Sequence, residues 1–116
     1  MEALAIDDSL PILDKIKKYV YNSTIMLHRL YIVRSLADAA RTVGFKDSQK
    51  HLLPVLEELM PDPEPALRQA LVEQIPEFSR FYIEINDTEA YTAVLHILIP
   101  MVAELTTDRH LQVPFY

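Results

Sequence analysis

The sequence predicts an all-α chain built as a stack of helical hairpins. Glycine occurs once in 116 residues, eight prolines provide the main breaks, and half of the residues are hydrophobic. Between these breaks, apolar residues recur every three or four positions, which is the spacing of a helix with one buried face. The pattern of one hairpin also repeats along the chain, so neighbouring hairpins can cover each other's apolar faces.

The clearest hairpin spans residues 52–85. Its first helix carries the apolar residues Leu52, Leu53, Leu56, Leu59 and Met60. Residues 61–65 (PDPEP) end that helix, and their last proline suits the first turn of the next one, where its missing N–H needs no partner. Asp62 or Glu64 is expected to cap the second helix. Its stripe is Leu67, Leu71, Ile75, Phe78, Tyr82 and Ile85. Pro76 lies inside this helix and is expected to bend it.

This unit recurs on both sides. Residues 98–113 match residues 52–67 at an offset of 46, and residues 11–16 match residues 54–59 at an offset of 43. A period of about 40–47 residues with two helices is typical of HEAT and armadillo arrays. The sequence therefore predicts a HEAT-type α-solenoid of about two and a half repeats over residues 1–116. The expected pairs are residues 8–43, 47–85 and 88–113, the last of them incomplete.

The first pair is expected to contain helices at about residues 10–20 and 25–43. Its caps are expected at Asp7, Asp8 and Ser9 for the first helix and at Gly44 for the end of the second. The expected buried side of the second helix is Leu27, Leu30, Ile32 or Tyr31, Leu36, Ala39, Ala40 and Val43.

The second pair is expected to open with Asp47 and Ser48 as caps, because both side chains can accept a backbone N–H. The fifth helix is expected at about residues 88–105. Its apolar residues are Tyr91, Val94, Leu95, Leu98, Met101, Val102 and Leu105.

Three prolines recur at one place in the first helix of each pair: Pro11, Pro54 and Pro100. A proline inside a helix removes a backbone hydrogen bond and crowds the preceding turn. We therefore expect these positions to bend the outer helices in the same way, which gives the array a consistent curvature.

Charged residues also recur between the pairs. Asp62 and Asp108 share the turn between two helices, where Ser23 stands in the first pair, and Arg29 matches Arg68 at an offset of 39. An aspartate in such a turn accepts backbone N–H groups and can pair with an arginine of a neighbouring repeat. These residues are expected to form a ladder along the array.

No catalytic, cofactor or metal site is predicted. Cysteine is absent, and a single glycine cannot build a phosphate-binding loop. None of the histidines lies four residues from another, so none forms a zinc-binding helix: His28, His51, His96 and His110. The absence of cysteine and of a basic, apolar leader predicts a cytoplasmic location, and a further presence in the nucleus is left open.

The net charge of −6 is concentrated in residues 57–89, which hold nine of the seventeen acidic residues and only two arginines. A net acidic chain without a basic stripe is not expected to bind nucleic acid. The longest apolar run, residues 97–103, is too short to span a membrane. The favoured interpretation of the acidic stretch is a solvated helix face. A protein-contact surface for a basic partner, formed by Glu57, Glu58, Glu64 and Glu73, is the alternative.

Over residues 10–113 the chain resembles the N-terminal HEAT repeats of the protein phosphatase 4 regulatory subunit 1 family. The segments that carry the resemblance are RLYIVRSL (29–36), LLPVL (52–56), DPEPALR (62–68), LVEQIP (71–76) and IPMV (99–102). The resemblance implies a non-catalytic scaffold that binds the serine/threonine phosphatase 4 catalytic subunit and directs its choice of substrate. A generic HEAT adaptor for another partner is the nearest alternative, and an enzyme with a helical fold is disfavoured.

The resemblance weakens at the C-terminal end. The repeat predicts an arginine at position 114, where the chain has Pro114. A truncated chain is therefore expected, either a natural isoform or a partial gene model. This allows a further alternative, an inert or interfering product. No sixth helix covers Leu95, Leu98, Val102 and Leu105, so part of this stripe is expected to pack back on the fourth helix and the rest to form an exposed apolar patch. Such a patch would drive self-association through residues 91–105 and leave binding of the catalytic subunit weak.

Overall fold

The computed structural model describes residues 5–112, and every regular element in that range is a helix. The all-α prediction is therefore confirmed for this part of the chain, whereas Pro114 lies outside it. Five helical runs follow one another, and three contain a five-residue π segment, labelled η. Their bounds are α1 Ile12–Ile16 with η2 Lys17–Tyr21; α2 Met26–Val43; α3 Phe45–Asp47 with η3 Ser48–Leu52 and α4 Leu53–Leu59; α5 Pro65–Ile85; and α6 Thr88–Ala93 with η4 Val94–Leu98 and α7 Ile99–Leu105.

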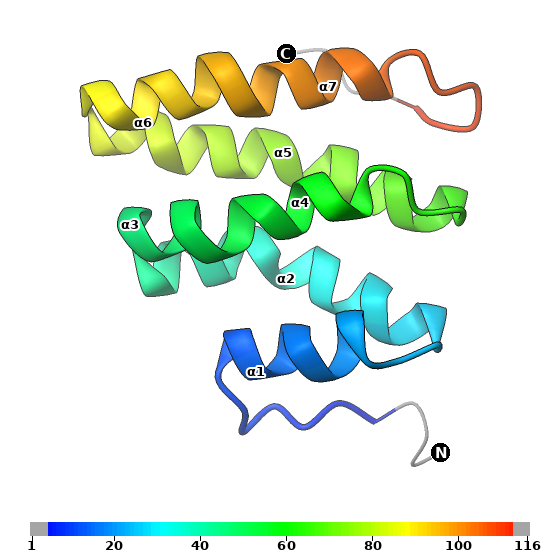
Figure 1. Cartoon of the computed structure of the whole chain (residues 1–116). Coiled ribbons are helices and arrows are strands. Elements are labelled where there is room, and N and C mark those ends of the chain that lie inside the picture. The colour runs from blue at the N-terminus through cyan, green and yellow to red at the C-terminus, as the bar shows by residue number, and fades with distance from the viewer. Residues whose placement is uncertain (1–4, 113–116) are drawn as a thin grey trace.

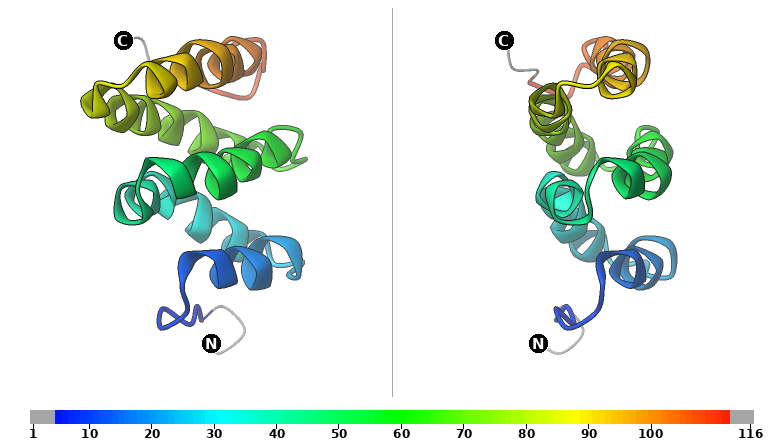
Figure 2. Two further views of the ribbon diagram at one scale, coloured as in Figure 1. Left: turned by 60° about the vertical axis from the view of Figure 1, so that its left-hand side comes forward. Right: turned by 90° about the vertical axis from the view of Figure 1, so that its left-hand side faces the viewer.

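The helices stack in two layers (Figure 1). In the right-hand view of Figure 2, α2 and α5 form one layer, here called inner. The run from α1 to η2, the run from α3 to α4 and the run from α6 to α7 form the other layer, here called outer. The described chain measures 43 × 34 × 18 Å. Its smallest extent matches two helices of about 10 Å diameter each, so the core is confined to the space between neighbouring helices.

The core follows the contact between α2 and α5. The stripe expected on α5 is buried, and five of its six side chains are at most 1% exposed: Leu67, Leu71, Ile75, Phe78 and Tyr82. On α2 the expected face was partly wrong. Ile32 is buried as expected, whereas Leu27 is 49% exposed and Tyr31 is 47% exposed. Val33 and Ala37, which were not on the expected face, are buried. Helix α2 packs against both its own hairpin and α5. Its buried residues therefore extend around more of the helix than one apolar stripe.

Gly44 ends α2 as expected. Its φ of 90° lies in the region that favours glycine, and its N–H donates to the carbonyl four residues earlier. The next helix begins immediately at Phe45, so the prediction that Asp47 and Ser48 cap it was wrong. Ser48 is fully buried instead. Its hydroxyl donates to the Phe45 carbonyl at 2.9 Å, which leaves the Tyr82 hydroxyl to donate to Ser48 Oγ at 2.7 Å.

Pro54 and Pro100 lie at equivalent positions of the backbone. Pro54 and Pro100 each take the second position of an α segment that directly follows a π segment. These π segments, residues 48–52 and 94–98, lie 46 residues apart. A wider turn before a proline relieves the contact between its ring and the preceding turn. Pro11, in contrast, precedes α1 as its N-cap residue, so only two of the three prolines are equivalent.

The expected side-chain caps do not form at the starts of α1 and α5. Asp7 accepts the Ser9 N–H at 3.0 Å, and Asp62 accepts the Glu64 N–H at 2.9 Å. Each aspartate therefore binds the N–H two residues further on, in a tight turn ahead of the helix. Each carboxylate is thus occupied in the turn and does not cap the N–H groups of the helix that follows.

The run from α6 to α7 packs one side into the core. Leu98 and Leu105 are 0% and 4% exposed, whereas Leu95 is 60% exposed, so part of the stripe packs back on the stack and part is uncovered, as expected. Residues 88–105 are long and apolar enough to cross a membrane by length and composition alone. One such helix is weak support for a span, because helices that pack on a protein core pass the same test.

Candidate functional site

The four residues expected in the ladder form two ion pairs between neighbouring hairpins. Arg29 Nε donates to Asp62 Oδ2 at 3.2 Å, and Arg68 Nε donates to Asp108 Oδ2 at 2.6 Å. All four side chains are between 9% and 17% exposed. Arg68 Nη1 also donates to the Asp62 carbonyl at 2.6 Å, which joins the two pairs. Partly buried, charge-assisted bonds of this kind are stronger than exposed ones.

The turns that hold these aspartates share one geometry. Asp62 Oδ1 accepts the N–H two residues on at 2.9 Å, and Asp108 Oδ1 does the same at 2.9 Å. In the first hairpin, Ser23 Oγ accepts the Ile25 N–H at 3.1 Å. Ser23 therefore forms the same turn, but it has no carboxylate that could pair with an arginine. Its hydroxyl lies 2.8 Å from Nδ1 of His28, a buried side chain that the sequence did not single out.

The electrostatics of the ladder are most visible at Asp108. The hydrogen bond from Arg68 lowers the pKa of the Asp108 carboxyl from its usual 3.8 to about 2, and the His110 backbone N–H contributes in the same direction. A lowered carboxyl pKa means that the ionised form is the one that the folded chain stabilises. The Asp108 pair is therefore an ion pair throughout the physiological pH range.

Gln74 joins α5 to α2 through the backbone. Its Oε1 accepts the Ala37 N–H at 2.9 Å, and its Nε2 donates to the Arg34 carbonyl at 3.2 Å. This role could not be predicted from the sequence, because a glutamine on a helix gives no sign of where its amide points. The only signal was its place in the segment LVEQIP, on which the family resemblance partly depends.

Exposed ion pairs follow the edge where the hairpins meet. Arg41 Nη1 lies 2.8 Å from Glu84 Oε2, and Lys46 Nζ lies 2.7 Å from Glu89 Oε2. Both pairs join residues 43 positions apart. The Arg41 guanidinium lowers the pKa of Glu84, and its own pKa is raised in turn. Exposed pairs contribute little stability, so their main effect is to favour one register between neighbouring hairpins.

The four acidic residues proposed as a protein-contact surface are all exposed but lie on different elements. Glu57 and Glu58 are on α4, Glu64 is in the turn before α5, and Glu73 is on α5. Glu58 lies beside Tyr21, and partial burial together with this carboxylate raises the Tyr21 pKa to about 12. The four side chains therefore do not share one helix face.

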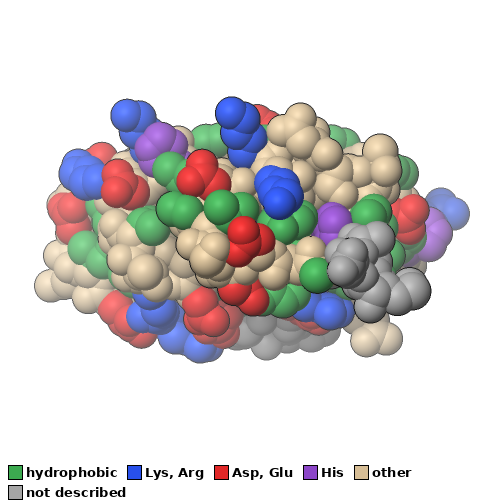
Figure 3. Space-filling view, turned by 90° about the horizontal axis from the view of Figure 1, so that it is seen from below, with side chains coloured by type: hydrophobic (Ala, Val, Ile, Leu, Met, Phe, Trp, Pro, Cys, Tyr) green, Lys and Arg blue, Asp and Glu red, His purple; other side chains and the backbone are tan. Residues whose placement is uncertain are grey.

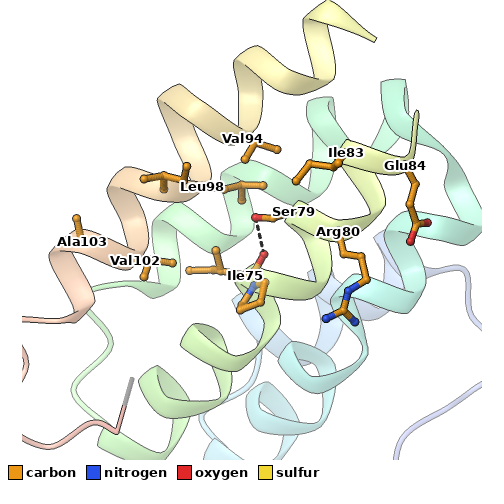
Figure 4. A pocket seen from close by; sticks show the side chains of 11 residues that line it. Ile75, Ser79, Arg80, Ile83, Glu84, Val94, Leu98, Val102 and Ala103 are labelled. Atoms are coloured by element: carbon orange, nitrogen blue, oxygen red, sulfur yellow. Dashed lines mark hydrogen bonds between the residues drawn. The ribbon is translucent and has the colours of Figure 1, made fainter. Parts of the chain in front are cut away.

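The clearest concave surface is a groove between α5 and the run from η4 to α7 (Figure 4). It has a volume of about 600 Å³ and is mostly apolar. Ile75 and Ile83 line it from α5, and Leu98 and Val102 line it from the opposite side. Arg80 is the basic residue among those that line it, and its guanidinium reaches Glu77 on the same helix at 3.0 Å.

The opposite end of the stack has a mixed character. In the view of that end, acidic and basic side chains are interspersed with hydrophobic ones (Figure 3). Among residues 5–112, no three His, Asp or Glu side chains are arranged so that they could hold a metal ion.

The chain is similar to phosphatase regulatory subunits. It is 33% identical over 109 residues to a human protein described as serine/threonine-protein phosphatase 4 regulatory subunit 1-like, over 91% of this chain and 25% of that protein. It is 31% identical to human serine/threonine-protein phosphatase 4 regulatory subunit 1 and 30% identical to the mouse protein. Those two matches each cover 97% of this chain and 12% of the relative.

The chain thus spans between an eighth and a quarter of the length of the curated relatives that it matches. No family model matches the chain. No solved structure gives a significant match either.

Proposed function

We propose that this chain, which is homologous along almost its whole length to one part of protein phosphatase 4 regulatory subunit 1, is a non-catalytic scaffold that binds the phosphatase 4 catalytic subunit. The relatives are named as regulatory subunits, and the predicted family resemblance agrees with the matches. A cytoplasmic location belongs to the same proposal.

The same proposal includes the architecture, a HEAT-type α-solenoid. It is supported by the two layers of helices and by elements that recur at an offset of 46 residues, among them the π segments that precede Pro54 and Pro100. The observation that carries it furthest is the ladder. Arg29–Asp62 and Arg68–Asp108 join successive hairpins through equivalent atoms. In a repeat array each unit is stabilised by its contacts with the next unit.

A binding experiment with purified proteins tests the proposed function. The chain is immobilised and offered the phosphatase 4 catalytic subunit, with a related serine/threonine phosphatase as the specificity control. Retention of the phosphatase 4 subunit alone is the expected result. A folded chain that retains neither phosphatase would refute this function and favour a HEAT adaptor for another partner or an inert product.

A matched variant shows whether retention depends on the folded array. Leu71 is fully buried in α5, and an aspartate there places an unpaired charge in the core. Leu71→Asp is therefore expected to abolish retention together with the helical signal. Retention that survives in an unfolded Leu71→Asp chain would show non-specific adsorption.

A further inference from the structure

A second groove lies in the outer layer, between α4 and the run from η4 to α7. It has a volume of about 460 Å³ and is here called the outer groove. Both of its walls are described helical runs that follow one another in the outer layer (Figure 2), so its shape does not depend on any helix beyond them. Its apolar lining includes Met101, which is 4% exposed, and the half-buried Met60 and Ile97.

The charged lining of the outer groove is acidic. Glu57 contributes from α4 and Glu104 from α7, and both residues are exposed. Among the described residues, no lysine or arginine lines the groove. Within residues 5–112, neither carboxylate takes part in an ion pair. Two unpaired carboxylates in one groove attract a positively charged occupant.

The outer groove has a filled counterpart one hairpin earlier, between η2 and α4. Glu104 corresponds there to Glu58, at an offset of 46. Glu58 lies beside Tyr21, an η2 residue, whose side chain takes up space at this interface. The first interface therefore supplies a partner for its glutamate from the chain itself.

The counterpart also contains basic residues that the outer groove lacks. Lys17 and Lys18 of η2 correspond to Met60 and Pro61 at an offset of 43. Where the first interface has two lysines, the second has an apolar side chain and a proline. The outer groove is thus left with acidic residues and an apolar lining, and a basic occupant would supply the missing cations.

We propose that the outer groove binds an extended, basic segment of a partner protein, with an arginine or lysine at each end of a short apolar stretch. The two cations pair with Glu57 and Glu104 on opposite walls, and the apolar side chains between them pack on Met60, Ile97 and Met101. This inference is independent of the phosphatase 4 catalytic subunit, so either proposal can fail without the other.

The dimensions of the outer groove favour an extended segment of about four residues. Its wall on η4 and α7 runs from His96 to Glu104, which is about 12 Å of helix. An extended chain covers this length with about four residues. A helix of the same length, about 10 Å wide, would occupy about twice the volume of the groove. A second copy of the chain is a poorer occupant, because its Lys17 and Lys18 are held in a helix.

The test uses a fluorescent peptide with the core Arg-Leu-Leu-Arg between glycine and serine residues. Its binding to the 116-residue chain is measured by fluorescence anisotropy at low salt. The double variant Glu57→Gln with Glu104→Gln changes two exposed side chains, so it keeps the fold, which circular dichroism checks. Binding to this variant is expected to weaken about tenfold, or about threefold for each exposed ion pair. A peptide with the core Arg-Ser-Ser-Arg is also expected to bind more weakly, because it lacks the apolar side chains.

The matched control makes the same change in net charge on the inner layer. Asp38 on α2 and Glu73 on α5 are exposed and outside the outer groove, so Asp38→Asn with Glu73→Gln is expected to bind the peptide like the wild-type chain. A charge exchange tests the pairing directly. The double variant Glu57→Lys with Glu104→Lys should prefer a peptide with the core Glu-Leu-Leu-Glu.

Three results would overturn the proposal. The first is absence of binding of the Arg-Leu-Leu-Arg peptide to the wild-type chain. The second is equal binding to the two charge-neutralised double variants, which would show a general attraction to the net charge of −6. The third is a wild-type dimer that Glu57→Gln with Glu104→Gln converts to a monomer in sedimentation experiments, because a second copy would then be the occupant.

Discussion

Removing the arginine that joins both ladder pairs should weaken the whole stack. Arg68 donates to the Asp108 carboxylate and to the Asp62 carbonyl, both at 2.6 Å, and its side chain is 14% exposed. Arg68→Ala removes both charge-assisted bonds and leaves Asp108 without its cation. We expect a loss of about 1–2 kcal/mol in the free energy of unfolding, because each bond to a charged group contributes on this scale and part of the loss is recovered by solvent.

Urea denaturation followed by circular dichroism measures this loss. With a slope of about 1–2 kcal/mol per molar urea for a domain of this size, the midpoint should fall by about 1 M. Arg80→Ala is the control, because Arg80 is 57% exposed and its ion-pair partner among residues 5–112 is Glu77 on its own helix. Its midpoint should stay close to that of the wild type. Equal midpoints for the two variants would refute the structural role of the ladder.

The pH dependence of stability gives an independent check. The pKa of Asp108 is lowered to about 2 in the folded chain from its usual 3.8. A lowered carboxyl pKa contributes stability that is fully present above the unfolded value and is lost as the pH falls through the folded value. The wild-type chain should therefore lose this contribution between about pH 4 and pH 2, and Arg68→Ala should lose less over the same range.

Three further predictions concern packing. Leu71→Asp should unfold the chain, because Leu71 is fully buried, whereas Glu73→Lys should leave it folded, because Glu73 is exposed. Circular dichroism distinguishes the two, and an unfolded Glu73→Lys variant would contradict the assigned helix face. Gln74→Ala should lower the free energy of unfolding, measured by urea denaturation, by about 1–2 kcal/mol, because it removes two hydrogen bonds to the α2 backbone. The loss should exceed that of Gln69→Ala, which removes an exposed bond to the Gln112 carbonyl. Tyr82→Phe should cost about 1 kcal/mol, because a buried hydroxyl bond to Ser48 is lost, and an unchanged melting temperature would refute this.

The sequence predicted the helices and the ladder residues because both depend on local regularities. The stripe from Leu67 to Tyr82 follows helical spacing, and a repeat of Asp and Arg at fixed offsets indicates neighbouring hairpins. The start of the third helix could not be found in this way. Asp47 and Ser48 have the composition of a cap, but Gly44 turns the chain so sharply that the helix begins before them. The buried position of Ser48 is explained by its tertiary contact with the Tyr82 hydroxyl.

The π segments and the groove between α5 and the run from η4 to α7 could not be predicted from the sequence either. A π segment has the same composition as an α-helix, so Pro54 and Pro100 indicated a disturbance but not its form. The burial of Leu98 depends on how the last run is rotated against α5, and a rotation of one residue position moves a side chain by about 100° around the helix. The sequence could therefore predict that part of the stripe on residues 91–105 packs back on the stack, but not which of its residues do so.

The stacking of each hairpin only on the next has a consequence for how fast the chain folds. Among the described residues, no side-chain hydrogen bond joins positions more than 43 apart. Closing loops of this modest length has a small entropic cost, which grows only slowly with length. Chains dominated by such near-neighbour contacts fold in microseconds to milliseconds. Folding can therefore start in any one hairpin and spread to its neighbours, without waiting for the two ends of the chain to meet.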